Sequence, residues 1–265
     1  MLFDRLRLLG VLCVLVSTTN AATLSVEEVV SHCQAKPQGR DQRSTLKITM
    51  TSRDGNESTS EYVRLWKDYS SVDDLVEKMA LFTTSPKESV GLNYLRWAYQ
   101  PSSDKAPEQW VHLPELKKVR RVSQRDPNDM NWGLIDEDFQ IRRFGDDDHQ
   151  LLEASVTGDL HHYIVQSTPR QSVSVYGRWV THYTTRRGWE GCAPAEVDYY
   201  DKSNTLLKRV TYRWLTIKGA WVWDEVTITN RKTGATVRYQ TQAAEVDVGL
   251  EDGDFTEKTL KRGLR

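Results

Sequence analysis

Runs of acidic residues are the first candidates for chemistry in this chain. Asp136, Glu137 and Asp138 are consecutive, and two of these carboxylates could act as a general acid–base pair. No partner base or nucleophile is identifiable beside them, and the chain lacks G-x-S-x-G, H-E-x-x-H, a Walker loop and a dinucleotide fingerprint. We therefore expect no enzymatic activity, and a hydrolase using Asp136 or Asp138 is the least favoured hypothesis.

Metal ligands are equally poorly arranged. Asp146, Asp147 and Asp148 are consecutive, whereas the ligands of a calcium loop are spaced so that they converge, so we expect a solvated turn. His161 and His162 are adjacent, and on a strand they would point to opposite faces. We expect neither a metal site nor a cofactor.

A run of basic residues stands out in a chain whose charges otherwise balance. One interpretation is an exposed strand edge whose cations prevent aggregation. The other is a docking patch for anionic lipid headgroups or for an acidic protein surface. The patch consists of Lys117, Lys118, Arg120, Arg121 and Arg125.

The first 22 residues have the order of a secretion signal. Arg5 and Arg7 precede an apolar run at 8–16 that is too short to span a bilayer, and small residues follow, with cleavage expected after Ala21 or Ala22. We expect a cleavable signal at 1–22, export to the periplasm and one domain at 23–265. Cys33 and Cys192 remain after cleavage, and in an oxidising compartment they either pair or stay as two thiols.

The composition argues against nucleic acid as a partner. The 265 residues carry 36 Lys and Arg against 37 Asp and Glu, for a formal charge of −1, so the electrostatic attraction for phosphate is missing overall. The 9 Trp and 11 Tyr are numerous for such a polar chain, and aromatic side chains with one polar edge suit ligand cavities and interfaces.

Short alternating segments dominate the rest of the chain. Leu46, Ile48 and Met50 alternate with polar residues, as on a half-buried strand, and Asp54-Gly55 is a hairpin signal. Few helices are expected: one at 25–34 with Ser25 and Glu28 as a capping box, one near Asp136, and a turn at 256–260 capped by Asp254. The expected strands are 46–50, 61–69, 78–84, 92–99, 109–113, 150–156, 161–166, 177–184, 196–200, 206–215, 222–229 and 236–246.

The late strands each have one apolar face and one polar face, which is typical of an antiparallel sheet with one solvated side. Such a sheet must cover its apolar face, so we expect a mainly β fold. In it a curved antiparallel sheet forms an incomplete β-barrel, with a few short helices as a lid. The expected lid segments are the N-terminal helix and residues 128–139. The expected cavity lining is Val210, Tyr212, Trp214, Val226, Ile228, Val237 and Tyr239.

The letters WVHLPELKKVRRV at 110–122 resemble the signature W-x-Y-L-P-x-L-x-R-V-R-R-I of the outer-membrane lipoprotein-sorting family, the LolA/LolB-like proteins often associated with MMPL/RND transporters. The segment at 130–139 occupies the place of the family's F-M-G-S-D-F-x-Y-E-D, and Asp254-Phe255-Thr256 is similar to its final turn. This resemblance extends over nearly the whole mature chain.

The resemblance implies an incomplete barrel with an apolar cavity and no cofactor. It also implies a periplasmic carrier or chaperone that binds a lipid or the acyl chains of a lipoprotein, with an inner-membrane MMPL/RND-type transporter as partner. The alternative is a transporter adaptor or envelope-sensing protein with the same fold and no transported ligand, since fold alone does not choose between these functions.

Overall fold

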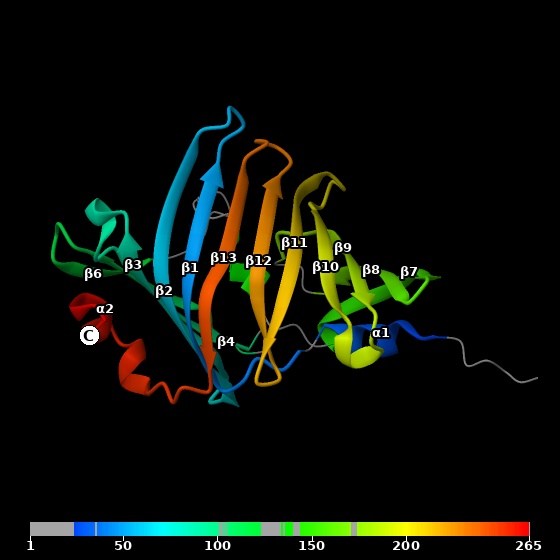
Figure 1. The fold of residues 1–265 in the computed structure, drawn as a ribbon, viewed down its shortest axis with the longest axis horizontal. Helices are drawn as coiled ribbons and strands as arrows, with labels where there is room; N and C mark the ends of the chain where they lie inside the picture. Colours follow the sequence, from blue (N-terminus) through cyan, green and yellow to red (C-terminus); the bar gives the residue numbers. More distant parts are fainter. Residues whose placement is uncertain are drawn as a thin grey trace, which may run out of the picture.

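The computed structural model has one curved antiparallel sheet as its main element (Figure 1). The structure describes residues 24–264 except for 35, 101–102, 104, 123–133, 135, 140–143 and 171–173. The sheet has thirteen strands in the order β6-β5-β4-β3-β2-β1-β13-β12-β11-β10-β9-β8-β7, with β6 and β7 at its two edges. It does not close into a barrel, so the predicted mainly β fold with an incomplete barrel and few short helices is confirmed.

The first six strands form a meander on one side of the sheet. Most of them are longer than the alternation predicted, because polar residues at their ends also join the ladder. Residues 118–122, which contain three of the five residues of the basic run, form an additional strand, the edge strand β6. The strands are β1 (Asp41–Thr51), β2 (Glu57–Val72), β3 (Leu75–Ser85), β4 (Asn93–Tyr99), β5 (Glu108–Leu113) and β6 (Lys118–Val122).

The other seven strands form a second meander, which begins at the opposite edge with β7 and ends beside β1 with β13. Antiparallel pairing of β1 with β13 joins the two meanders, so the first and last long strands of the chain lie side by side at the middle of the sheet. These strands are β7 (Asp147–Thr157), β8 (Leu160–Pro169), β9 (Arg178–Thr185), β10 (Ala193–Tyr200), β11 (Leu206–Ile217), β12 (Ala220–Asn230) and β13 (Thr236–Val246).

The helices that the structure describes are short. Helix α1 (Val26–Cys33) begins at Ser25, whose side chain and Glu28 form the predicted capping box. The predicted cap of the C-terminal helix was wrong: Thr256 caps α2 (Glu257–Arg262), whereas Asp254 accepts from the backbone N–H of Glu251. The 3-10 helices are η1 (Lys87–Ser89), η2 (Asp136–Phe139), η3 (Phe144–Asp146), η4 (Trp189–Gly191) and η5 (Asp252–Phe255). No helix in the described ranges is long and apolar enough to cross a membrane.

The C-terminal segment covers the outer face of β2–β5. Phe255 and Leu260 are buried there against Leu65, Phe82 and Leu95. The opposite faces of the same strands carry Trp66, Met79 and Leu81 into another cluster on the concave side. Strand β3 is therefore buried on both faces, and its apolar run is continuous rather than alternating.

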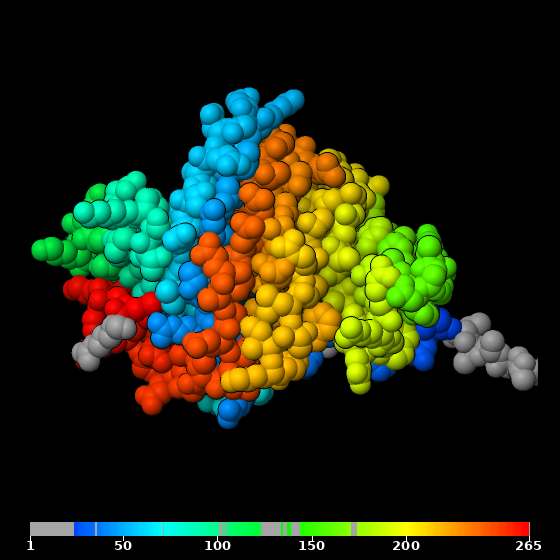
Figure 2. Space-filling view, in the orientation of Figure 1, coloured from blue at the N-terminus to red at the C-terminus, as the bar shows by residue number. Residues whose placement is uncertain are grey.

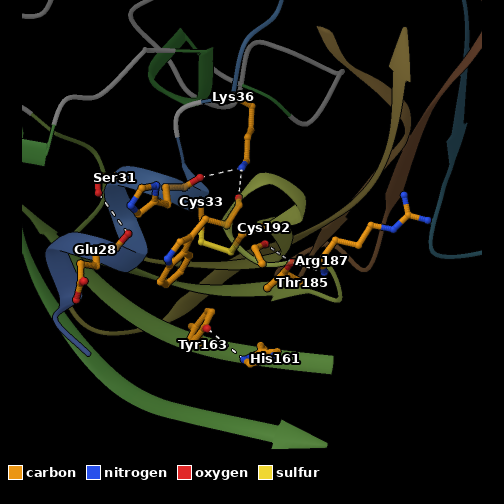
Figure 3. The surroundings of a disulfide bond; sticks show 12 residues. Glu28, Ser31, Cys33, Lys36, His161, Tyr163, Thr185, Arg187 and Cys192 are labelled. Atoms are coloured by element: carbon orange, nitrogen blue, oxygen red, sulfur yellow. Dashed lines mark hydrogen bonds between the residues drawn. A yellow bond between two sulfur atoms is a disulfide. The ribbon is translucent and has the colours of Figure 1, made fainter. Parts of the chain in front are cut away.

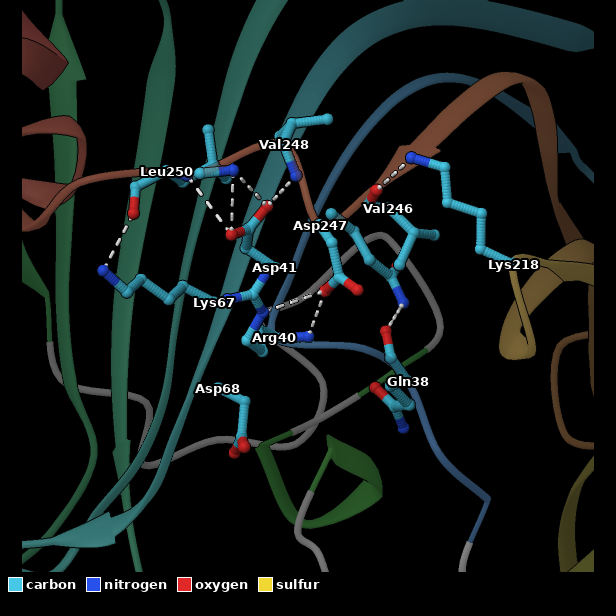
Figure 4. Close-up of polar contacts among 12 residues, drawn as sticks. Gln38, Arg40, Asp41, Lys67, Asp68, Lys218, Val246, Asp247, Val248 and Leu250 are labelled. Atoms are coloured by element: carbon cyan, nitrogen blue, oxygen red, sulfur yellow. Dashed lines mark hydrogen bonds and ion pairs between the residues drawn. The ribbon is translucent and has the colours of Figure 1, made fainter.

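Asp41 fixes the path of the chain where β13 leaves the sheet (Figure 4). Its carboxylate is 4 % exposed and accepts from the backbone N–H groups of Val248, Gly249 and Leu250 at 2.7 to 3.3 Å. Lys67 Nζ donates to the carbonyl of Leu250 at 2.8 Å. Because these donors would otherwise be unsatisfied near the sheet, Asp41 ties the start of β1 to the connection that carries η5 and α2 to the outer face.

Candidate functional site

The concave face of the sheet holds a cavity of about 720 Å³. Its walls come from strands β1–β4 and β9–β13, and the segment 34–39 and helix η2 complete them. Aliphatic side chains line one part of the cavity, namely Leu46, Ile48, Met79 and Leu81. Pockets of 300–1,000 Å³ with mostly apolar walls and a few polar groups are typical small-molecule sites.

Aromatic side chains form another part of the wall. Tyr212 stacks on Trp214 with 5.7 Å between ring centroids, and Tyr176 lies 4.7 Å from Tyr199. Burial raises the pKa of Tyr199, Tyr212 and Tyr239 far above the usual value for a phenol, so these hydroxyls stay neutral at every physiological pH. This part of the wall therefore presents an apolar surface with uncharged hydroxyl groups.

The structure divides the seven predicted lining residues into two sets. Tyr212, Trp214 and Tyr239 line the cavity. The other four are buried in the adjoining concave-face cluster, which also contains Leu134 at 3 % exposure, and they do not line the cavity. These four residues are Val210, Val226, Ile228 and Val237. Binding by any of the seven stays a prediction.

An ion pair connects helix η2 to the cavity wall. Asp138 Oδ2 lies 2.5 Å from Lys208 Nζ, and the Tyr176 hydroxyl donates to Asp138 Oδ1 at 2.8 Å. The neighbouring Glu137 accepts from the Ser174 hydroxyl and from the backbone N–H of Val175. Both acidic side chains are therefore engaged in holding η2 against β11 and the residues before β9, an arrangement that fits a structural role for Glu137 and Asp138.

A second polar cluster lies at the β2–β4 end of the cavity. Glu77 accepts from Arg96 Nη1 at 2.5 Å and from Trp66 Nε1 at 2.6 Å. Arg64, which lines the cavity, donates to the Gln42 side chain at 3.0 Å. Burial lowers the pKa of Arg64 to about 10 despite the nearby Glu77 carboxylate, so the guanidinium is still cationic at neutral pH. The cavity wall thus contains a fixed cation at this end.

A disulfide bond anchors α1 (Figure 3). Cys33 in α1 is bonded to Cys192, which precedes β10, and both residues are fully buried. Val29 and Val30 pack with Tyr163, Val165 and Tyr183, so α1 covers the concave face at the β7–β9 end. Of the two alternatives for the cysteines, the structure shows the pair.

The residues that follow α1 form part of the cavity rim. Lys36 Nζ donates to the carbonyls of His32 at 2.8 Å and Trp189 at 3.0 Å, and it lies over the ring of Trp221. Burial lowers the pKa of Lys36. Gln34 and residues 36–39 thus reach the cavity while α1 itself is fixed beside it. The other expected lid segment, 128–139, lies partly outside the described residues, and its role as a lid stays a prediction.

Lys117, Lys118, Arg120 and Arg121 lie in the β5–β6 turn and in edge strand β6, and all four are exposed. Arg121 Nη2 pairs with Glu108 Oε1 at 2.5 Å. Arg125 lies outside the described residues, as does the predicted signal at 1–22.

The expected solvated turn at Asp146–Asp148 was partly wrong. Asp147 begins β7 and is 1 % exposed, because β8 pairs with it through Pro169. In the described ranges no three His, Cys, Asp or Glu side chains gather as a metal site.

Sequence reasoning missed Lys208, Tyr176 and Arg64. Each lies on or beside a predicted strand, and its partner in the structure is distant in the chain. Lys208 and Asp138, for example, are separated by 70 residues. A lysine on the apolar face of an alternating strand was the available signal, because such a residue needs a buried partner.

The fold defines the class of protein. The chain superposes on a putative outer-membrane lipoprotein-sorting protein domain from Vibrio parahaemolyticus with a TM-score of 0.70 and 21 % identity, over 89 % of this chain and 96 % of that one. A DUF1329 family protein from Desulfovibrio piger gives 0.75 and 23 % over 88 % and 96 %. A LolA superfamily protein from Nitrosomonas europaea gives 0.62 and 16 % over 89 % and 99 %.

These likenesses confirm the predicted resemblance at the level of the fold: the chain has the same fold as these three proteins, two of which are described as a putative outer-membrane lipoprotein-sorting domain and a LolA superfamily protein. A family model described as an uncharacterized protein matches residues 76–262, so the chain belongs to that family. No curated protein sequence matches this chain.

Proposed function

We propose that the protein is a periplasmic carrier that binds an acyl chain of a lipid or lipoprotein in the concave-face cavity. The observation that carries this proposal is the cavity of about 720 Å³ between the aromatic wall and the aliphatic residues of β1 and β3. A related fold is described as a lipoprotein-sorting domain in Vibrio parahaemolyticus. We further propose that an inner-membrane transporter of the MMPL/RND type exchanges cargo with it, and that no catalysis occurs.

The energetics are favourable for an acyl chain. Removing about ten methylene groups from water contributes roughly 8 kcal/mol before the entropy lost on binding is subtracted. The neutral Tyr hydroxyls cost nothing in charge burial, and Arg64 provides a cation for an anionic headgroup at the β2–β4 end. The predicted lining residues Tyr212, Trp214 and Tyr239 are the ones we expect the chain to contact.

A fluorescent fatty acid offered to delipidated protein tests this function. We expect saturable binding that a phospholipid or a lipopeptide competes away. Thr241→Trp fills part of the cavity, since Thr241 lines it, and should weaken binding at least tenfold. Gln242→Trp is the matched control, because Gln242 is the exposed next residue of the same strand, and its variant should bind normally.

Two results would oppose the carrier. Absence of uptake by the parent protein would favour an adaptor or envelope sensor that carries no ligand. Equal binding by the parent and by Thr241→Trp would place the probe outside the cavity. Native mass spectrometry of protein purified from its own envelope would then identify any co-purifying lipid by its mass.

A further inference from the structure

One end of the sheet exposes three aliphatic side chains on two neighbouring turns. Val90 and Leu92, in the β3–β4 connection, are 49 % and 43 % exposed, and Leu116, in the β5–β6 turn, is 51 % exposed. The two turns are in contact: His112 Nδ1 lies 2.7 Å from the carbonyl of Gly91, and Pro114 packs directly against Gly91. The three aliphatic groups therefore belong to one projecting end of the molecule.

Cations surround this apolar end. Lys87 lies in the β3–β4 connection, and Lys117, Lys118 and Arg120 follow Leu116. The last turn of α2 adds Lys261 and Arg262, because Asn93 Nδ2 donates to the carbonyl of Leu260 at 2.9 Å and holds that turn beside β4. All six cations are exposed.

Few acids oppose these cations. The exposed acids of the two turns are Glu88 and Glu115, and one helical turn earlier on α2 Glu257 balances Lys258. Arg121 is already paired with Glu108. In a chain with a formal charge of −1, this end is thus strongly cationic. In Figure 2 the atoms of η1, β6 and α2 gather at the same end of the molecule.

We propose that this end, defined by Val90, Leu92 and Leu116 with the cations around them, docks on the surface of an anionic lipid bilayer. Aliphatic residues on projecting turns can enter the boundary between headgroups and acyl chains, while lysine and arginine stay at the level of the anionic headgroups. Each Lys or Arg near such a surface strengthens binding about fivefold at physiological salt. The proposal concerns where the protein sits and does not depend on what the cavity holds.

The chemistry of the patch favours a membrane over an acidic protein. The centres of protein interfaces are rich in aromatic residues and poor in lysine. The two turns have the opposite composition: 86–92 and 114–117 contain no aromatic residue and include Lys87 and Lys117. Exposed aliphatic and cationic side chains thus share the same two turns, as on surfaces that insert into a membrane interface.

Co-sedimentation of the mature protein with vesicles tests the proposal. With vesicles of phosphatidylglycerol and phosphatidylcholine we expect binding that weakens as salt is raised, and at least tenfold weaker binding to phosphatidylcholine alone. Lys117→Glu/Lys118→Glu should reduce binding to the anionic vesicles at least tenfold. Leu116→Asp should reduce it by a similar factor without altering the far-UV circular dichroism spectrum.

Matched variants at other positions act as controls. Leu152→Asp changes a side chain of similar exposure, 49 %, on edge strand β7 at the opposite edge of the sheet. Arg231→Glu/Lys232→Glu changes the net charge by the same amount in the β12–β13 turn. Both should bind like the parent protein. Equal loss in the controls, or no preference of the parent for anionic vesicles, would overturn the proposal, and an acidic protein partner would then be the better interpretation of the patch. Thr241→Trp should lose fatty-acid binding and keep vesicle binding. That result would show that the cavity and the docking surface act independently, so that one proposal can be wrong while the other is right.

Discussion

Asp138 and Lys208 form a buried ion pair across 70 residues of sequence. Their charged atoms lie 2.5 Å apart, and their side chains are 2 % and 9 % exposed. The Lys208 ammonium also lies 5.4 Å from the ring centre of Tyr176 and 5.1 Å from that of Tyr199. This pair joins helix η2 to strand β11 at the wall of the cavity, so the position of η2 depends on it.

Replacing Lys208 by Met should lower the free energy of unfolding by about 3–5 kcal/mol, because it leaves the Asp138 carboxylate buried without its cation. Urea denaturation followed by circular dichroism measures this loss. Arg213→Ala is the control, since Arg213 and Asp224 form an exposed pair worth less than about 1 kcal/mol. Equal effects of the two variants would contradict a structural role for the buried pair.

Removing the disulfide should destabilise the protein and loosen α1. The bond closes a loop of 159 residues, and the chain-entropy model assigns such a loop about 5 kcal/mol. Cys33→Ser/Cys192→Ser should therefore have a lower urea midpoint than the parent. A reducing agent should lower the midpoint of the parent to that of the double variant and leave the double variant unchanged; a parent that is insensitive to reductant would argue against the bond.

Stability should fall as the pH drops below about 6.5, the usual pKa of histidine. Burial is the main cause that lowers the pKa of His182, whose ring lies 3.2 Å from His162 Nε2, and burial likewise lowers the pKa of His149. The unfolded chain then binds more protons than the folded one, so unfolding is favoured as the pH falls through this window. His182→Gln should flatten the dependence of the urea midpoint on pH between 7 and 5, and an unchanged slope would exclude His182 as its source.

Ile228→Ala should separate the buried cluster from the cavity lining. Ile228 is 1 % exposed and does not line the cavity, so truncation should cost about 2–5 kcal/mol of stability. Binding of the fluorescent fatty acid should stay within twofold of the parent when measured under conditions where both proteins are folded. A large loss of affinity would mean that the acyl chain reaches the cluster around Ile228.

The alternation of apolar and polar residues predicted most strands, because side chains on a strand point alternately to its two faces. The N-terminal helix was also predictable, since the capping box of Ser25 and Glu28 is local in sequence. Lys118, Arg120 and Arg121 of the basic run lie in β6 at the edge of the sheet, and docking by the run stays a prediction.

The local alternation of residues did not predict how deeply each side chain is buried along a strand. Val210 and Tyr212 share a face of β11, yet only Tyr212 lines the cavity. Leu134, which belongs to the same buried cluster as Val210, comes from a segment more than seventy residues earlier. Which part of an apolar face is covered depends on such distant segments, and no local pattern contains that information.

By itself the sequence determined the class of fold, the positions of most strands along the chain, the capping box of α1 and the cationic run. Each of these depends on residues that are neighbours in the chain. The tertiary structure alone decided the Asp138–Lys208 pair, the choice of the Cys33–Cys192 bond over two free thiols, and the position of Val90 and Leu116 on neighbouring turns at one end of the sheet. These relationships join residues far apart in sequence. Their geometry is set by the register and curvature of the whole sheet, which place each side chain opposite its partner.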